Sequence, residues 1–128
     1  MIQKPLASVA KQTVTMPGAK ECQMQLLAGP ADACANFAMR KFTVAPGGHT
    51  PLHQHDYEHE ILILAGGGVA FGNGKDSPIH PGDVLIVPAN EPHQLKNNTS
   101  QPLEFICMVP AAVHRPGAPA PTLIDCST

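Results

Sequence analysis

The chain has 128 residues, of which 14 are proline and 11 glycine, and its formal net charge is -2 at pH 7. This length suits one compact domain with its own hydrophobic core, and we expect residues 1–128 to form a single domain. The slightly negative charge and the absence of a Lys/Arg cluster argue against nucleic acid and against membrane surfaces as partners. No apolar run approaches the roughly 20 residues that are needed to span a bilayer.

Proline and glycine divide the chain into short runs rich in Val, Ile, Leu, Phe and Thr, a pattern typical of an all-β sandwich or barrel. Residues 1–11 are expected to form an N-terminal arm, which could cross to a neighbouring subunit. The Pro/Ala-rich tail at 110–122 is expected to be extended and poorly packed, and Leu123 with Ile124 could return as an edge strand. Strands are expected at 12–16, 23–28, 37–45, 59–65, 69–71, 84–87, 93–96 and 103–109.

Side-chain alternation predicts which residues of these strands face the interior. In 103–109 the fully apolar set should point inward, and it consists of Leu103, Phe105, Cys107 and Val109. In the strand at 37–45 an exposed Lys41 is the easier assignment, because a charged amine strongly resists burial. Arg40 would then point inward, where it needs a carboxylate, backbone carbonyls or an anionic substrate as its partner.

Four histidines carry the strongest chemical signal. His53, His55 and His59 lie within one short stretch, and they share a face if that stretch is extended, while His93 comes from a distant strand. Four imidazoles on one inner surface predict a buried mononuclear metal site. The expected cofactor is one divalent transition metal per chain, with Fe, Cu, Ni, Co and Zn suited to imidazole and Mn tolerated.

The spacing of these histidines resembles the two sequence motifs of the cupin superfamily. Gly47 is followed after five residues by His53-Gln54-His55, then by His59 after three more and by Gly66 after a further six. Gly82 begins the second motif, which continues through Pro88-Ala89-Asn90 to His93 and Asn97. Two positions depart from the usual pattern: His59 stands where glutamate is usual, and Asn90 stands where glycine is usual. Asparagine tolerates a positive φ better than other non-glycine residues, so we expect the turn to be kept.

The resemblance implies an all-β double-stranded β-helix, or jelly-roll barrel, of the small single-domain cupin type (cupin 2) with a four-histidine metal site inside. Neutral imidazole ligands would leave the ion its full +2 charge and would favour anions or a deprotonated substrate. The favoured function is a dioxygenase-like oxidoreductase acting on a small organic substrate. The alternative is a non-catalytic cupin that binds a sugar-like molecule, or a Lewis-acid isomerase. A homodimer is expected by analogy with other small cupins.

Further candidates surround this predicted site. The pocket is expected to include Arg40, Phe105, Cys107 and Val109, with Cys107 either near the metal or simply a small core residue. Tyr57 is expected at the rim, Glu60 is expected to face away from the metal, and Glu58 is a less favoured alternative ligand or base. We expect the three histidines outside the motifs, His49, His80 and His114, to be exposed. We expect the four cysteines to be reduced thiols of a cytoplasmic protein, and they are Cys22, Cys34, Cys107 and Cys126.

Overall fold

The computed structural model describes residues 1–124. Within this range the chain is all-β, and its only helices are the single 3₁₀ turns η1 (Leu6–Ser8), η2 (Pro30–Asp32) and η3 (Ala111–His114). No helix in this part of the chain is both long and apolar enough to cross a membrane. The strands are β1 (Gln12–Thr13), β2 (Lys20–Ala28), β3 (Phe37–His49), β4 (His53–Gln54), β5 (His59–Ala65), β6 (Gly68–Gly72), β7 (Lys75–Ile79), β8 (Val84–Val87), β9 (Gln94–Lys96), β10 (Leu103–Pro110) and β11 (Thr122–Leu123).

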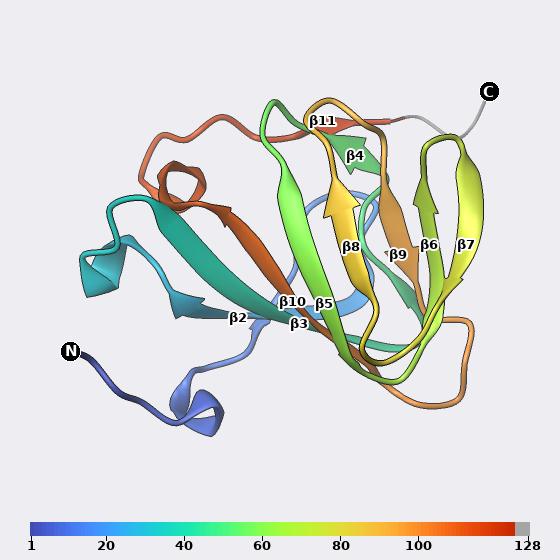
Figure 1. Cartoon of the computed structure of the whole chain (residues 1–128), viewed down its shortest axis with the longest axis horizontal. Helices are drawn as coiled ribbons and strands as arrows, with labels where there is room; N and C mark the ends of the chain where they lie inside the picture. The colour runs from blue at the N-terminus through green and yellow to red at the C-terminus, as the bar shows by residue number, and fades with distance from the viewer. Residues whose placement is uncertain (125–128) are drawn as a thin grey trace.

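One large antiparallel sheet curls into a half-barrel (Figure 1). Its strands lie in the order β7-β6-β9-β3-β10-β5-β8, with β2 paired to β3 and β1 paired to β2. Strand β3 joins the two walls, because most of its length pairs with β2 and β10 while its last residue, His49, pairs with Lys96 of β9. The inside of the curl therefore receives side chains from strands that are far apart in sequence.

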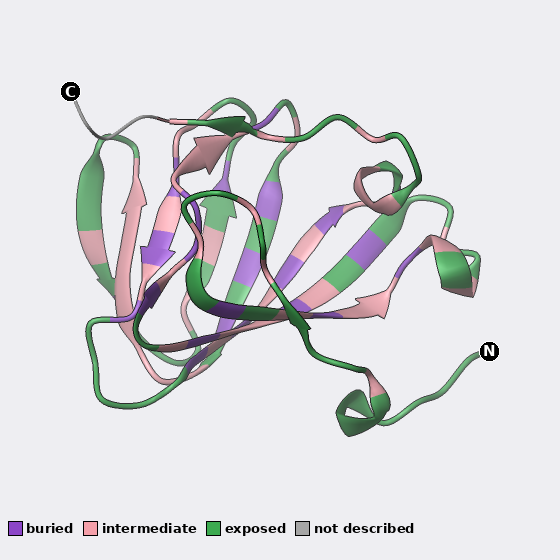
Figure 2. Ribbon diagram, turned by 180° about the vertical axis from the view of Figure 1, so that it is seen from behind, coloured by how far each residue is buried: buried purple, intermediate pink, exposed green. Residues whose placement is uncertain are grey.

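Alternation along β10 separates the core from the outer surface. Leu103, Phe105, Cys107 and Val109 are all at most 3 % exposed, as their parity predicted. Figure 2 shows the alternation of buried and less buried bands along the central strands. These inward side chains form one core cluster with residues of β3, β5, β7, β8 and β9.

Lys41 corrects one expectation from strand parity. It lies on the face of β3 opposite to Arg40, as predicted, but its exposed fraction is only 9 %. The ammonium group is 2.7 Å from the Glu104 carboxylate on the neighbouring strand β10. An opposite charge within hydrogen-bond distance compensates for lost hydration, which is why a buried lysine is tolerated here.

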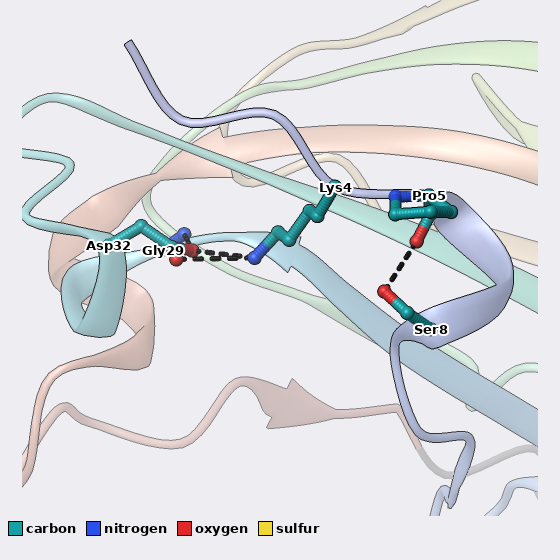
Figure 3. Close-up of polar contacts among 5 residues, drawn as sticks. All are labelled: Lys4, Pro5, Ser8, Gly29 and Asp32. Atoms are coloured by element: carbon teal, nitrogen blue, oxygen red, sulfur yellow. Dashed lines mark hydrogen bonds and ion pairs between the residues drawn. The ribbon is translucent and has the colours of Figure 1, made fainter.

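The N-terminal arm packs against its own chain. The Gln25 side-chain amide, which is 3 % exposed, donates to the carbonyl oxygens of Leu6 and Val9. Lys4 forms an ion pair of 3.1 Å with Asp32, whose carboxylate also accepts from the Gly29 amide (Figure 3). These contacts attach the arm to the η2 turn and the outer side of β2, and its exchange with another subunit stays a prediction.

The ends of several elements differ from those predicted. Strand β1 stops at Thr13 rather than residue 16, β3 runs on to His49, and neither β4 nor β7 was among the expected strands. The tail was expected to be extended and poorly packed, but residues 111–114 form the 3₁₀ turn η3, in which Ala111 is fully buried, which corrects that expectation. The edge strand is confirmed, because β11 pairs with β4 and the Ile124 amide donates to the Leu52 carbonyl. Three cysteines are free thiols as expected, Cys22, Cys34 and Cys107, and Cys126 lies outside the described residues.

Candidate metal centre and cavity

The four predicted histidines meet inside the curl of the sheet. Their candidate ligand atoms all lie within 4.8 Å of one another. His53 and His93 are held opposite each other by two backbone hydrogen bonds of 3.0 and 3.2 Å, which join the two motifs. His59 begins β5, and His55 lies in the turn between β4 and β5. The spacing of the motifs thus brings together the four histidines that the sequence predicted.

Each of these histidines has a partner on its Nδ1 atom. Nδ1 of His53 lies 2.7 Å from the Pro51 carbonyl oxygen, that of His55 lies 2.7 Å from the Tyr57 oxygen, and that of His93 lies 2.9 Å from the Glu91 oxygen. A carbonyl can only accept, so these three rings carry their proton on Nδ1 and present a lone pair on Nε2. Nδ1 of His59 faces a sulfur atom instead, 3.1 Å away on Cys107.

The Nε2 atoms fit a divalent transition metal. Nε2 of His93 is buried without a hydrogen-bond partner, and those of His55 and His59 lie 2.6 Å apart. Such convergence of neutral imidazole nitrogens, each oriented by an acceptor on its other nitrogen, is the arrangement found around protein-bound metals. The four histidines could therefore hold one ion.

Burial keeps these rings neutral. It lowers the pKa of His53 from 6.5 to about 4 and that of His59 to about 2, with the Arg40 guanidinium contributing to both shifts. Burial lowers the pKa of His55 and His93 as well. A neutral imidazole is the form that binds a metal, so the site needs to release few protons to load one at neutral pH.

Arg40 points into the curl, as strand parity predicted. One guanidinium nitrogen, Nη2, lies 3.2 Å from the Cys107 sulfur, and the guanidinium carbon lies 4.9 Å from the ring centroid of Phe42. Phe42 in turn stacks on Phe105 with centroids 5.2 Å apart. The Nε atom of Arg40 is buried and has no hydrogen-bond partner in the structure. Among the described residues Arg40 thus contacts a sulfur and an aromatic face in place of the expected carboxylate or backbone carbonyls, and its Nε–H has no partner.

These groups line a cavity of about 440 Å³. Arg40, Phe105 and Cys107 belong to its wall, together with His53, His59 and His93. Most of the remaining wall is apolar, and its described lining includes no Asp, Glu or Lys. With a divalent cation in place, the cavity would carry strong positive charge in an apolar surrounding, which favours an anionic ligand.

Two expectations about the pocket need correction. Val109 faces inward but does not line the cavity, because it lies opposite the fully buried Ala38 near the end of β10 and packs into the core. His114, expected to be exposed, is half-buried in η3 and lines the cavity. Its Nε2 atom is buried without a partner, and burial and Arg40 lower its pKa. Its position after β10 could not be inferred from the motifs, since it depends on how η3 folds back.

The tail forms part of the cavity wall. Residues 118–121 line this cavity, and they also line a second one of about 500 Å³, so the tail lies between the two. The pairing of Leu123 with His53 holds it beside the candidate metal centre. Composition alone suggested an extended segment but gave no indication of what it would cover.

The other candidates fall into place around the centre. Tyr57 lines both cavities and stacks on the His55 ring at 3.9 Å, consistent with a position at the rim. Glu58 and Glu60 are exposed, and neither belongs to the histidine cluster. His80 is exposed, as expected. His49 was also expected to be exposed, but it is half-buried and lies within hydrogen-bond reach of Gln94, which corrects the expectation for this residue.

Comparisons with known proteins agree with this architecture. The polyketide cyclase RemF from Streptomyces resistomycificus has a similar structure, with a TM-score of 0.88 and 29% identity over 99% of this chain and 87% of that one. The 1-methylthio-D-xylulose 5-phosphate methylsulfurylase of Rhodospirillum rubrum is 36% identical over 81 residues, 63% of this chain and 52% of that protein. The oxalate-binding protein of Thermotoga maritima is 40% identical over 70 residues, 54% of this chain and 58% of that protein.

The chain spans about half the length of these two curated relatives. The sequence model described as "Cupin domain" matches residues 40–109, which is more than half of the chain and includes all four clustered histidines. The family match and the curled all-β sheet agree with the resemblance seen in the motifs, and the chain belongs to the cupin domain family.

Proposed function

We propose that this protein is a metal-dependent enzyme that binds a small, oxygen-rich organic anion and transforms it by Lewis-acid catalysis. The observation that carries the proposal is the cavity itself, in which Arg40 and three imidazoles of the four-histidine cluster share an apolar chamber whose described lining has no acidic group. A divalent ion held by His53, His55, His59 and His93 would polarise a carbonyl or enolate oxygen of the substrate. Similarity to a polyketide cyclase over nearly the whole chain supports a reaction of this class.

The chain's own residues have separable tasks in this proposal. Arg40 would bind an anionic oxygen through its unsatisfied Nε–H, and burial of that donor makes the interaction stronger than it would be in water. Phe42 and Phe105 would form the apolar wall against which a flat substrate lies and would exclude water. His114 Nε2, unpartnered and largely neutral, would accept a proton from the substrate and later return it.

A dioxygenase-like oxidoreductase is the second candidate. It is favoured by the all-imidazole donor set, because neutral ligands raise the reduction potential of a bound ion. The apolar cavity wall favours it too, since a dry site suits oxygen chemistry. A binding protein without catalysis is the remaining alternative.

The first experiment tests the anion site. Metal-free protein is loaded separately with Zn, Mn, Fe, Ni, Cu or Co, and binding of oxalate and of its neutral analogue oxamide is measured by calorimetry. We expect oxalate to bind the loaded protein far more tightly than oxamide, and Arg40→Met to weaken oxalate binding about 10-fold or more, because a charged hydrogen bond contributes about 1.5–3 kcal/mol. Arg40→Lys, which keeps the charge but not the fork, should lose less. Equal binding of the two compounds would contradict the proposal.

The second experiment separates the reaction classes. Diketone-, catechol- and flavonol-type compounds are incubated with each metal form, in air and under nitrogen, with His114→Gln as a variant. Turnover by the zinc form under nitrogen that falls in His114→Gln supports Lewis-acid chemistry. Turnover that requires air and consumes oxygen indicates a dioxygenase, whereas oxalate binding without turnover in any form indicates a binding protein.

A further inference from the structure

His59 is oriented differently from the other three histidines of the centre. The Nδ1 atoms of those three face backbone carbonyls, which no substitution can delete. The Nδ1 atom of His59 faces the Cys107 side chain, 3.1 Å away. The orientation of one ring in the cluster therefore depends on the identity of a single amino acid.

The Cys107 sulfur lies between two strands that serve the site. In the sheet register Cys107 pairs with Arg40 of β3 on one side and with Ile61 of β5, the strand that begins at His59, on the other. The sulfur is 3.2 Å from Arg40 Nη2, and both Cys107 and His59 are at most 4 % exposed. Water is thus largely excluded as an alternative partner for the His59 ring.

The chemistry of the imidazole ring decides which atom donates in the contact between His59 and Cys107. When Nε2 of a neutral histidine binds a metal, its proton must be on Nδ1, which then needs an acceptor. Cys107 Sγ is the acceptor that the structure provides for His59, and donation from Arg40 to the same atom holds the sulfur in place. Because sulfur is a weak acceptor, the contact from Arg40 Nη2 is needed to keep the Cys107 sulfur in place beside His59 Nδ1.

We infer that Cys107 is the positioning residue of His59: its sulfur, held by Arg40, fixes the ring so that Nε2 points at the metal. The inference rests on the proposed metal site. The competing explanation is that Cys107 only fills space in the core, as buried cysteines commonly do. The two explanations differ in what a residue of similar size without an acceptor would do.

The test compares two substitutions at one position. Cys107→Val fills similar space but cannot accept a hydrogen bond, whereas Cys107→Ser keeps an acceptor. Zinc affinity is measured by competition with a chromophoric chelator, and the visible spectrum of the cobalt-loaded protein reports ligand geometry. We expect Cys107→Val to lose about 10–100-fold in zinc affinity and to shift the cobalt bands, and Cys107→Ser to stay close to wild type in both measurements.

Cys22→Val is the matched control. Cys22 is a buried core thiol with the same 2 % exposure, and it is not part of the histidine cluster. Its variant should keep wild-type zinc affinity, while urea unfolding of the metal-free proteins reports the packing cost of each change. If Cys107→Val kept wild-type zinc affinity, or if Cys107→Val and Cys22→Val lost equal zinc affinity, the inference about Cys107 would be overturned and the proposed function would not be affected. Failure of the wild-type protein to bind any of the metals would instead overturn the proposed function.

Discussion

Arg40 acts on several groups of the candidate site. It contacts the Cys107 sulfur and the Phe42 ring, and it contributes to lowering the pKa of all four clustered histidines and of His114. Burial is the main cause of these lowered pKa values, and the permanent Arg40 cation adds to it, because a second positive charge nearby is unfavourable. At the residue scale the four neutral imidazoles could hold a metal, and under the proposed function the buried Arg40 cation would attract an anion.

Cys22 offers a prediction about stability at high pH. Burial raises the pKa of its thiol from 9.0 to about 11. Below pH 9 the thiol is protonated in both the folded and the unfolded state, so its contribution to the free energy of unfolding does not change with pH. Between pH 9 and 11 the unfolded thiol loses its proton while the folded one keeps it, so the free energy of unfolding falls as pH rises. The contribution lost by pH 11 is about 2–3 kcal/mol.

Urea unfolding of wild type and Cys22→Ala at pH 8 and pH 11 checks this prediction. The variant is less stable at pH 8 because it leaves a cavity, but its deficit relative to wild type should shrink by that amount at pH 11. A deficit that stays constant across this range would show that ionisation of Cys22 does not affect folding.

At the scale of elements, tight turns set the register of the strands that carry the two histidine motifs. Strand β5 leads into the turn at Gly66, where the chain passes close to Pro102, the residue before β10 begins. Asn90 has φ +66°, so the turn of the second motif is kept with asparagine in place of glycine, as expected. These turns hold the two motifs in the register that opposes His53 and His93.

Gly66 and Gly74 form a matched pair for a test of the first turn. Both have a positive φ, +76° and +73°, so alanine meets the same backbone strain at either position. A Cβ at Gly66 would collide with the Pro102 carbonyl, whereas one at Gly74 would have nothing within 4 Å. Gly74→Ala should cost about 1–2 kcal/mol and Gly66→Ala about 3 kcal/mol or more, measured by urea unfolding. Similar losses would show that backbone strain alone decides.

At the scale of the whole molecule, the outer side of the sheet carries several exposed apolar side chains. Side chains on this face of β3, β10, β5 and β8 neighbour one another in the register, and several are more than one-third exposed. The exposed carboxylate of Glu60 lies between Met108 and Ile86 in this register, so it interrupts the apolar surface. Exposed apolar surface of this kind is typical of an interaction site, and a broad sheet face is best covered by another sheet face packed about 10 Å away. The exposed members are Phe37, Met39, Leu62, Leu64, Val84 and Ile86.

We expect this face to pack against a second copy of the chain, giving the homodimer suggested by the sequence. Ile86→Glu should convert a dimer into a monomer, as measured by light scattering during gel filtration. Ile2→Glu is the control, because Ile2 in the N-terminal arm is similarly exposed, 66% against 69% for Ile86. Dissociation by Ile2→Glu alone would assign the interface to an exchanged arm, and a monomeric wild type would contradict the prediction.

The amino-acid sequence by itself determined the all-β class, the inward set of β10 and the four clustered histidines. The first two depend on alternation within strands and on glycine and proline turns, which are local properties. That His93 joins the other three histidines was implied by the resemblance to the two cupin motifs. Only the tertiary structure decided that Lys41 is buried beside Glu104, that Val109 is core rather than cavity wall, and that His114 and the tail line the cavity. Those outcomes depend on contacts between segments that are distant along the chain, and such contacts exist only once the sheet has curled and its register is set.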